Sequence, residues 1–496
     1  MRDLTGLRIL RYLQNGANHM TFTELREKHP MFKFMEIFPD FQRTETGCVL
    51  HLKYLFSISG IDGLFTPTWE IPCKTELSQK PGFERLNSPL DDDPAFWRLI
   101  FSLGMAELVS YWKIACPPKV QLPDILIDKE QEDWWKRLYF GGLGEFFYRN
   151  GIKTDFDSFM QFDYNDPPYY ENYPEKPAQR TDLSGYLIPV GGGKDSIVTL
   201  NLLKDRLGDA YAYQINHRDS SEKAALLAGI PKERILEVKR TLDPNMLRLN
   251  KEGYLNGHTP FSAIVAFSAA LTAYINGLKT VVLSNESSAS ESTVSEAEVN
   301  HQYSKSYQFE RDFYEYEQKY LRCGVQYFSL LRPLTEFQIA RYFASLPTAY
   351  HEIFRSCNAG AKQDKWCGHC AKCLFVAVIL SPFLPYAEIV RLLGSDLFNL
   401  PEMEPVLQEL CGALPNKPFE CVGSRKEVNI SLCLAIRRAE QNGEALPKLL
   451  AAYRNSPLYA QYAEEALTFG QEWDPQHNLP DDLAELVRKA CVEAYR

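Results

Sequence analysis

The stretch Tyr186-Leu-Ile-Pro-Val-Gly-Gly-Gly-Lys-Asp-Ser196 joins an apolar run to three consecutive glycines and then to a polar Lys-Asp-Ser. The apolar run indicates a buried β-strand, and apolar residues at helical spacing follow it, namely Ile197, Leu200, Leu203 and Leu207. Glycines let the backbone approach a ligand closely, and the first N–H groups of a helix point toward an anion. This stretch therefore predicts a phosphate-binding loop between a strand and a helix.

Two common phosphate loops do not fit this stretch. A Walker A loop needs Ser or Thr after its Gly-Lys, whereas Asp195 stands there, and Ile188 replaces the first glycine of that motif. A dinucleotide-binding loop needs a third glycine three positions further on, and this sequence has none. A glycine-rich turn that binds no ligand is the alternative interpretation.

The stretch instead resembles the pyrophosphate loop (PP-loop), Ser-Gly-Gly-x-Asp-Ser, of enzymes that split ATP into AMP and pyrophosphate. Four positions match this pattern, and Gly191 stands in place of the leading Ser. The resemblance implies that Asp195 would help to hold Mg²⁺. It also implies that the ATP phosphates would be bound by Gly191, Gly192, Gly193, Lys194 and Ser196.

Strand and helix patterns alternate from residue 181 to residue 345, which predicts a doubly wound parallel α/β sheet. After the strand that enters the glycine loop, strands are predicted at 210–216, 234–238, 279–284 and 325–331. Ligands of such sheets bind beyond the carboxyl ends of the strands, where the strand order reverses. The glycine loop, Asn216, His258 and Asn285-Glu286 all fall in loops near strand ends, and Asn216 is a candidate for contact with adenosine.

The sequence divides into four predicted parts. Residues 1–180 form an α+β domain, expected to bind substrate, with strands at 47–58 and 65–71 and helices at 94–114 and 131–150. The Pro-, Tyr-, Asn- and Glu-rich segment 165–181 is the predicted linker. The other parts are a nucleotide-binding domain (181–345), a metal module (346–400) and a helical region (401–496).

Four cysteines, Cys357, Cys367, Cys370 and Cys373, have the close spacing that wraps thiolates around a tetrahedral metal ion. Zinc is favoured because its structural sites are closed by four such ligands, and an iron–sulfur cluster is the rival. Four buried thiols without a metal are the third possibility. Because the cysteines already supply four ligands, His369 is expected to be a bystander.

The net charge of −10 and the isoelectric point of about 5.6 argue against a protein that binds long nucleic acids. The sequence shows no signal peptide, and its longest apolar stretch, 261–275, is too short to span a bilayer. Twelve cysteines without a signal peptide indicate a reducing compartment. We therefore expect a cytoplasmic protein that does not insert into membranes.

A combination of motifs resembles a particular branch of the PP-loop superfamily, the UDP-N-acetylmuramoyl-L-alanyl-L-glutamate epimerases. The motifs are Gly-Gly-Gly-Lys-Asp-Ser (191–196), Asn-Gly-His-Thr-Pro (256–260), Ser-Asn-Glu-Ser-Ser (284–288), Asn-His-Gln-Tyr-Ser-Lys-Ser (300–306), Trp-Cys-Gly-x-Cys-x-Lys-Cys (366–373), Gly-Met-Ala-Glu (104–107), Tyr-Trp-Lys (111–113) and Phe-Glu-Cys-Val-Gly (419–423). The resemblance spans roughly residues 95–430. It implies that the terminal L-Glu of a UDP-linked muramoyl dipeptide is activated as an acyl-adenylate and inverted for peptidoglycan synthesis.

Inversion needs groups that remove and return the α-proton of the glutamate. His258 is the first candidate, since imidazole titrates near neutral pH, and its alternative role is to cap the entry of a helix. His301 and Lys305 share a polar stretch suited to moving protons. Glu286 is a candidate base or metal ligand. Two bases on opposite faces would suit the reaction, but the sequence does not pair them.

Two other functions are compatible with the sequence. One is a PP-loop ligase or sulfur-transfer enzyme acting on a nucleobase or tRNA, because the deazapurine nitrile synthases also carry a four-cysteine zinc site. The other is a nucleotide-sensing scaffold without catalysis. The acidic isoelectric point disfavours tRNA, and the intact Asp195-Ser196 pair disfavours a binding relic.

Overall fold

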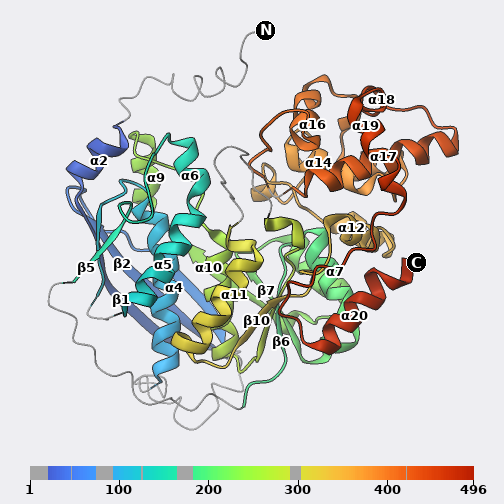
Figure 1. The fold of residues 1–496 in the computed structure, drawn as a ribbon. Coiled ribbons are helices and arrows are strands. Elements are labelled where there is room, and N and C mark those ends of the chain that lie inside the picture. Colours follow the sequence, from blue (N-terminus) through green and yellow to red (C-terminus); the bar gives the residue numbers. More distant parts are fainter. Residues whose placement is uncertain are drawn as a thin grey trace.

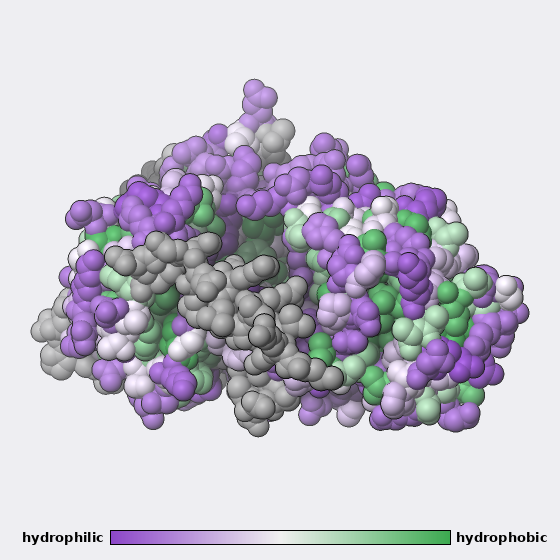
Figure 2. Space-filling view, turned by 90° about the horizontal axis from the view of Figure 1, so that it is seen from above, coloured by the Kyte–Doolittle hydropathy of each residue, from purple (hydrophilic) through white to green (hydrophobic). Residues whose placement is uncertain are grey.

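The computed structural model describes residues 20–45, 47–73, 93–123, 127–164, 182–290, 303–420 and 422–495. The linker predicted at 165–181 and the candidate His301 lie outside these ranges. Figure 1 shows a sheet-containing part on the left and a helical C-terminal part on the right, and Figure 2 shows a recess between them. Within the described residues, no helix is both long and apolar enough to cross a membrane.

One ten-stranded sheet runs through the left-hand part, in the order β10-β9-β6-β7-β8-β3-β2-β1-β4-β5. The strands are β1 (Met31–Thr44), β2 (Gly47–Ile58), β3 (Thr68–Cys73), β4 (Lys119–Gln121), β5 (Gln161–Asp163), β6 (Tyr186–Pro189), β7 (Ala210–Ile215), β8 (Ile235–Thr241), β9 (Thr280–Leu283) and β10 (Gln326–Ser329). All five strands predicted between 181 and 345 occur, and they pair in parallel. The sheet continues into the N-terminal region because β3 pairs antiparallel with β8.

The order of the parallel strands reverses between β6 and β9. From β6 the chain adds β7 and β8 on one side, and it then returns to place β9 and β10 on the other side. The loops that leave the carboxyl ends of β6 and β9 therefore diverge at this point. Ligands of open α/β sheets bind at such a switch point, and the glycine loop and Glu286 both lie there.

Helices cover both faces of the parallel strands because neighbouring strand residues point to opposite sides. Leu187 and Val281 pack in one core with α4 (Pro94–Trp112), α10 (Phe261–Ile275) and α11 (Tyr307–Tyr316). Ile188 and Val282 pack in a second core with α7 (Lys194–Leu202), α12 (Glu336–Ala344) and α14 (Ala371–Leu380). The mixed α/β class with a large parallel region is thus confirmed.

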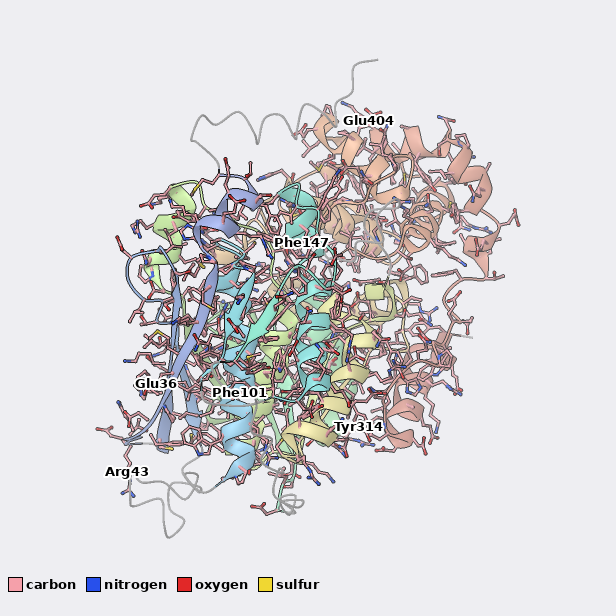
Figure 3. The ribbon with its side chains drawn as sticks, turned by 60° about the vertical axis from the view of Figure 1, so that its left-hand side comes forward. Glu36, Arg43, Phe101, Phe147, Tyr314 and Glu404 are labelled. Atoms are coloured by element: carbon pink, nitrogen blue, oxygen red, sulfur yellow. The ribbon has the colours of Figure 1, made fainter. Side chains whose placement is uncertain are left out.

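In the N-terminal region, α4 packs against the antiparallel strands β1 and β2. Phe101 on α4, labelled in Figure 3, stacks on Phe34 of β1 with ring centroids 6.0 Å apart. The helix predicted at 131–150 is two helices, α5 (Lys129–Gly142) and α6 (Gly144–Arg149). The chain packs closely at this break, where a Cβ atom on Gly142 would lie 2.5 Å from Pro260 at the entry of α10.

The C-terminal part is helical, as predicted for the region 401–496. Its long helix α17 (Arg425–Asn442) begins with a capping box in which the side chains of Ser424 and Glu427 each bond to the other residue's backbone N–H. Helix α20 (Asp481–Cys491) returns to pack against α7 and α12. At its other side this part contacts α6, where the rings of Phe419 and Tyr148 lie 5.5 Å apart.

The remaining helices have the following bounds: α2 (Phe22–Lys28), α8 (Asp219–Ala228), α9 (Pro244–Lys251), α13 (Thr348–Ile353), α15 (Tyr386–Leu393), α16 (Glu404–Cys411), α18 (Lys448–Arg454) and α19 (Pro457–Tyr462).

Candidate active site

The glycine loop has a conformation that other residues could not adopt without strain. Gly192 has a φ of +77°, and a Cβ atom there would clash with the side chain of Ser220. A Cβ atom on Gly193 would lie 2.8 Å from the hydroxyl of Ser356. Helix α7 starts at the next residue, and Gly193 has no side chain to cap its first N–H groups. The loop therefore presents backbone donors of the kind that bind anions.

Three carboxylates meet beside this loop. Asp195, Glu286 and Glu336 each place an oxygen atom within 4.8 Å of the others. Asp195 lies in the first turn of α7, Glu286 follows β9, and Glu336 is the first residue of α12, which follows β10. The group is thus assembled from three loops at one edge of the sheet. Carboxylate oxygens in this arrangement are the ligands that Mg²⁺ prefers.

Lysines compensate the charge of this carboxylate group. The buried ammonium of Lys194 pairs with both Asp195 and Glu336. Burial alone would raise the pKa of Asp195, but Lys194, Lys372 and Lys305 outweigh it, so the pKa is lowered. Asp195 is therefore ionised at neutral pH. The structure brings Lys194 to the carboxylates, and its contact with phosphates stays a prediction.

Glu336 is a member of the site that the sequence motifs do not identify. Thr335 and Gln338 form a capping box that fixes the start of α12 and so places Glu336 in its first turn. Burial raises the pKa of Glu336 and the neighbouring carboxylates Asp195 and Glu286 add to this, while Lys194 acts against it. The sequence signal that could have identified Glu336 is its position: it is an acidic residue in the first turn of the helix that follows the fifth parallel strand.

Arg332 connects two loops of the site. Its guanidinium donates to the backbone carbonyl oxygens of Glu286 and Lys305, each at 2.6 Å. Its Nε and one terminal nitrogen also donate to a carboxylate oxygen of Glu310, at 3.3 and 3.2 Å. Arg332 and Glu310 are each 1% exposed. This buried pair, absent from the sequence-based predictions, holds Glu286 and Lys305 in place.

His258 lies next to α6 and is not part of the carboxylate group. Its Nδ1 atom is 3.8 Å from a carboxylate oxygen of Glu145, and its side chain is 33% exposed. The preceding Gly257 packs against Phe146, and its carbonyl oxygen accepts a hydrogen bond of 2.5 Å from Lys113 on α4. The N-terminal region therefore positions this candidate base, and its catalytic role stays a prediction.

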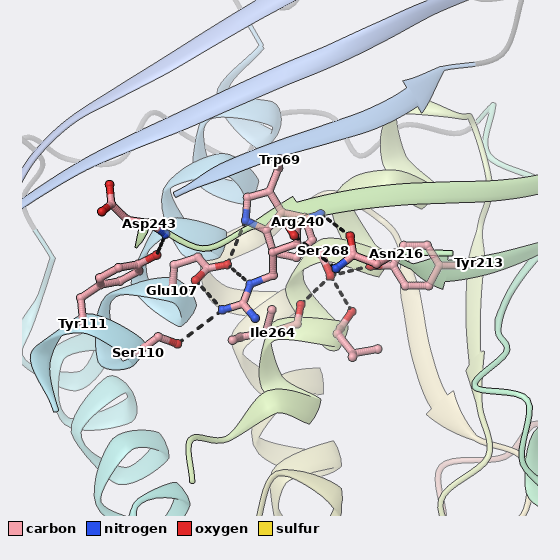
Figure 4. Close-up of polar contacts among 11 residues, drawn as sticks. Trp69, Glu107, Ser110, Tyr111, Tyr213, Asn216, Arg240, Asp243, Ile264 and Ser268 are labelled. Atoms are coloured by element: carbon pink, nitrogen blue, oxygen red, sulfur yellow. Dashed lines mark hydrogen bonds and ion pairs between the residues drawn. The ribbon is translucent and has the colours of Figure 1, made fainter. Parts of the chain in front are cut away.

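Asn216 has both polar atoms of its side chain engaged with β8. Its φ is +58°, its Nδ2 donates to the carbonyl oxygen of Arg240 at 3.2 Å, and its Oδ1 accepts from the Arg240 N–H at 2.9 Å (Figure 4). The left-handed backbone suits Asn, whose short side chain bonds locally. The contact with adenosine predicted for Asn216 remains untested by this arrangement.

A buried ion pair joins the N-terminal region to the parallel sheet. The Nε and a terminal nitrogen of Arg240 on β8 donate to the two carboxylate oxygens of Glu107 on α4, at 2.5 and 2.7 Å. The indole of Trp69 on β3 donates to the same carboxylate at 3.0 Å (Figure 4). This network gives Glu107, from one of the quoted motifs, a structural role.

Lys113 predicts a measurable pH dependence of stability. Burial, and then the charge of Arg240, lower its pKa from 10.5 to about 8. Between these values the unfolded chain holds a proton that the folded chain has lost, so the folded state gains stability as the pH rises. Between pH 8 and pH 10, we expect the free energy of unfolding of the wild type to rise by about 2–3 kcal/mol relative to that of Lys113→Met. Urea unfolding at both pH values measures this gain.

Lys251→Met, at an exposed position at the end of α9, is the matched control for this comparison. Equal pH dependence in the wild type and Lys113→Met would contradict the buried position of the ammonium.

The four cysteines predicted as metal ligands form one compact group. Sulfur–sulfur distances are 3.9 Å for Cys357–Cys370, 3.8 Å for Cys367–Cys373 and 3.6 Å for Cys370–Cys373. Four sulfurs at about 2.3 Å from a zinc ion would lie about 3.8 Å apart, so these distances fit a tetrahedral site. The Cys357 sulfur also accepts backbone N–H groups at 3.1 and 3.3 Å, as metal-bound thiolates do. His369 is outside the group.

These features define a class of protein: an α/β fold with a glycine loop and a carboxylate group at the switch point of a parallel sheet, followed by a four-cysteine module. The family model of the MurL N-terminal domain matches residues 26–330, and that of the MurL C-terminal domain matches residues 353–464. The chain therefore belongs to the MurL family.

Curated relatives carry the name UDP-N-acetyl-alpha-D-muramoyl-L-alanyl-L-glutamate epimerase. The relative from Xanthomonas oryzae pv. oryzae is 34% identical over 68% of this chain and 75% of its own length. The relative from Salinispora tropica is 36% identical over 78% of this chain and 81% of its own length. The relative from a Micromonospora species is 34% identical over 82% of this chain and 90% of its own length. No solved structure matches the chain. The family expected from the motifs is confirmed.

Proposed function

We propose that this protein is an ATP-dependent epimerase that converts the terminal L-Glu of UDP-N-acetylmuramoyl-L-alanyl-L-glutamate to D-Glu. The names of its relatives support the substrate and the epimerisation. One observation supports the use of ATP most directly: the Asp195–Glu286–Glu336 group lies beside the glycine loop at the switch point of the sheet. This is where an α/β sheet of this kind binds a nucleotide.

The reaction explains why an epimerase would consume ATP. The α-proton next to a glutamate carboxylate is very weakly acidic, because its removal would create a dianion. Joining the carboxylate to AMP removes its charge and lets the carbonyl group accept electron density. A base then removes the proton from one face, an acid returns one to the other face, and hydrolysis releases the product with AMP. Pyrophosphate leaves in the first step.

The PP-loop assignment gives each part of the site a role. Backbone N–H groups at Gly191–Gly193 and the start of α7 would bind the phosphates. Asp195, Glu286 and Glu336 would hold Mg²⁺, which neutralises the charge of the departing pyrophosphate. Ser196, whose hydroxyl donates to the Gly193 carbonyl oxygen at 3.0 Å, would fix the loop and contact a phosphate.

Proton transfer would involve His258 and Lys305. The Glu145 carboxylate lies 3.8 Å from Nδ1 of His258 and can orient the imidazole. Arg332 holds the backbone of Lys305, whose charge acts on Asp195 of the carboxylate group. A pair of groups approaching the α-carbon from two directions is what inversion needs.

The four-cysteine group would hold a structural Zn²⁺. Four thiolates close the coordination sphere and leave no position for a substrate, which is typical of structural rather than catalytic zinc. An iron–sulfur cluster would place several iron and sulfide atoms between the thiolates and hold them further apart. Elemental analysis of the purified protein should find one zinc per chain, and iron instead of zinc would overturn this assignment.

The decisive experiment incubates the protein with ATP, Mg²⁺ and the UDP-linked L-Glu dipeptide in deuterated water. We expect AMP, pyrophosphate and a D-glutamyl product that carries deuterium at the α-carbon. If AMP never forms, the ATP-dependent mechanism is wrong. If AMP forms but no deuterium enters the α-carbon, the protein is a ligase of the kind that the PP-loop superfamily also contains. His258→Gln should still form AMP but lose most of the deuterium incorporation.

A further inference from the structure

The four-cysteine module, residues 355–373, packs directly on the glycine loop. The backbone N–H of Arg355 donates to the carbonyl oxygen of Gly192 at 2.7 Å. The next residue, Ser356, occupies the space beside Gly193, where a Cβ atom would lie 2.8 Å from its hydroxyl. Both residues immediately precede the first metal-ligand candidate, Cys357. The loop and the module therefore cannot move independently at this point.

A second set of contacts comes from the segment between Cys357 and Cys367. The carboxylate of Asp364 accepts hydrogen bonds from the backbone N–H of Ser220 at 2.6 Å and from its hydroxyl at 2.7 Å. That hydroxyl is the group that leaves Gly192 no room for a side chain. Asp364 has a φ of +50°, so its backbone is held in the left-handed conformation that presents this carboxylate.

Arg218 adds a bridge between the same two segments. One of its terminal nitrogens donates to the carbonyl oxygen of Gly191 at 3.4 Å, and the other donates to that of Ala361 at 3.3 Å. Each of the three glycines thus has a neighbour that belongs to, or is bonded to, the cysteine module.

The module also delivers a cation to the carboxylate group. Lys372 lies between Cys370 and Cys373, is 7% exposed, and places its ammonium 4.9 Å from the centre of the Phe375 ring. That ring and the side chain of Glu336 both border Gly423, at 3.1 and 3.2 Å from the position of its missing Cβ atom. The charge of Lys372 accordingly acts on both Asp195 and Glu336.

We propose that the four-cysteine module is a wall of the nucleotide site, which holds the glycine loop in its anion-binding shape and places Lys372 against the phosphates of ATP. A metal ion bound by all four cysteines would fix the segments at 355–357, 360–367 and 370–373 relative to one another. The first two of these segments carry the contacts to the loop, and the third carries Lys372. The inference rests on the proposed function, since it presumes that the loop binds ATP.

The test measures binding of α,β-methylene-ATP with Mg²⁺ to the full chain by calorimetry, together with the zinc content and unfolding temperature. Lys372→Ala and Asp364→Ala should each weaken binding about 10- to 100-fold. The first variant removes the proposed charge-assisted contact of Lys372 with the phosphates, and the second removes the hydrogen bonds by which Asp364 supports the glycine loop through Ser220. Both should retain the wild-type zinc content. Lys362→Ala, an exposed lysine of the same module, is the matched control and should bind like the wild type.

A second measurement follows the metal itself. Removal of zinc by a chelator under reducing conditions should abolish nucleotide binding, and addition of zinc should restore it. Wild-type affinity in both Lys372→Ala and Asp364→Ala overturns the inference and leaves the proposed function intact. A wild-type protein that binds no nucleotide overturns the proposed function, and with it this inference.

Discussion

Replacing Asp195 by Asn should lower the rate of AMP formation by about 1,000-fold and change the unfolding temperature little. Asp195 is the member of the carboxylate group that lies on the glycine loop's own helix, and three lysines keep it ionised. An amide of the same shape cannot hold Mg²⁺ as a carboxylate does, and a loss of about 4 kcal/mol of transition-state stabilisation corresponds to this factor. Folding is spared because Lys194 keeps its pair with Glu336.

The measurement is release of labelled AMP and pyrophosphate at saturating Mg²⁺ and substrate. Asp205→Asn is the control, because Asp205 is an exposed carboxylate in the turn that follows α7. It should retain wild-type rates. Normal AMP formation by Asp195→Asn would show that the carboxylate group does not serve ATP cleavage.

Replacing Arg332 by Met should destabilise the protein by about 3–5 kcal/mol and lower AMP formation strongly. The buried Glu310 would lose its cationic partner, and the carbonyl oxygens of Glu286 and Lys305 would lose their donor. Burial already raises the pKa of Glu310, against the opposing effect of Arg332. Its carboxyl would therefore take up a proton in the variant, and the stability lost should be smaller at acidic pH. Urea unfolding at two pH values checks this.

A double variant separates stability from loop positioning. In Arg332→Met combined with Glu310→Gln, no buried charge remains without a partner, so part of the unfolding free energy should return. AMP formation should stay low, because no donor holds the loop carbonyl groups. If stability and activity recover together, Arg332 contributes only to folding and does not position Glu286 and Lys305.

The sequence predicts best what its local patterns encode. The glycine loop, the strands β6–β10 and the four cysteines each have a signal within a few residues, and the structure contains all of them. Strand β1 has no clear signal, because Pro39 and several exposed charged residues interrupt its apolar pattern. Its place between β2 and β4 comes from pairing with distant segments.

The parts of the site that sequence reasoning missed depend on long-range contacts. Lys194 and Glu336 are 142 positions apart in the chain, and no local pattern pairs them. Arg332 has no local sequence signal, because its role depends on two distant backbone carbonyl groups that only the fold brings to it. Asn216 shows the converse: its position at a strand end was predicted, but its amide bonds to β8. The sequence therefore predicts which residues lie at the edge of the sheet. It does not predict which of these residues form hydrogen bonds or ion pairs with one another.

The pairing of β3 with β8 limits which parts of the protein can move relative to one another. Backbone hydrogen bonds between β3 and β8 and the buried Glu107–Arg240 pair join the described part of residues 20–164 to the parallel strands, so a hinge between them would break both. The sheet-containing part must therefore behave as one rigid block. A substrate as long as a UDP-linked dipeptide therefore cannot be admitted by a hinge between β3 and β8, and the C-terminal helices share a core with the same parallel strands.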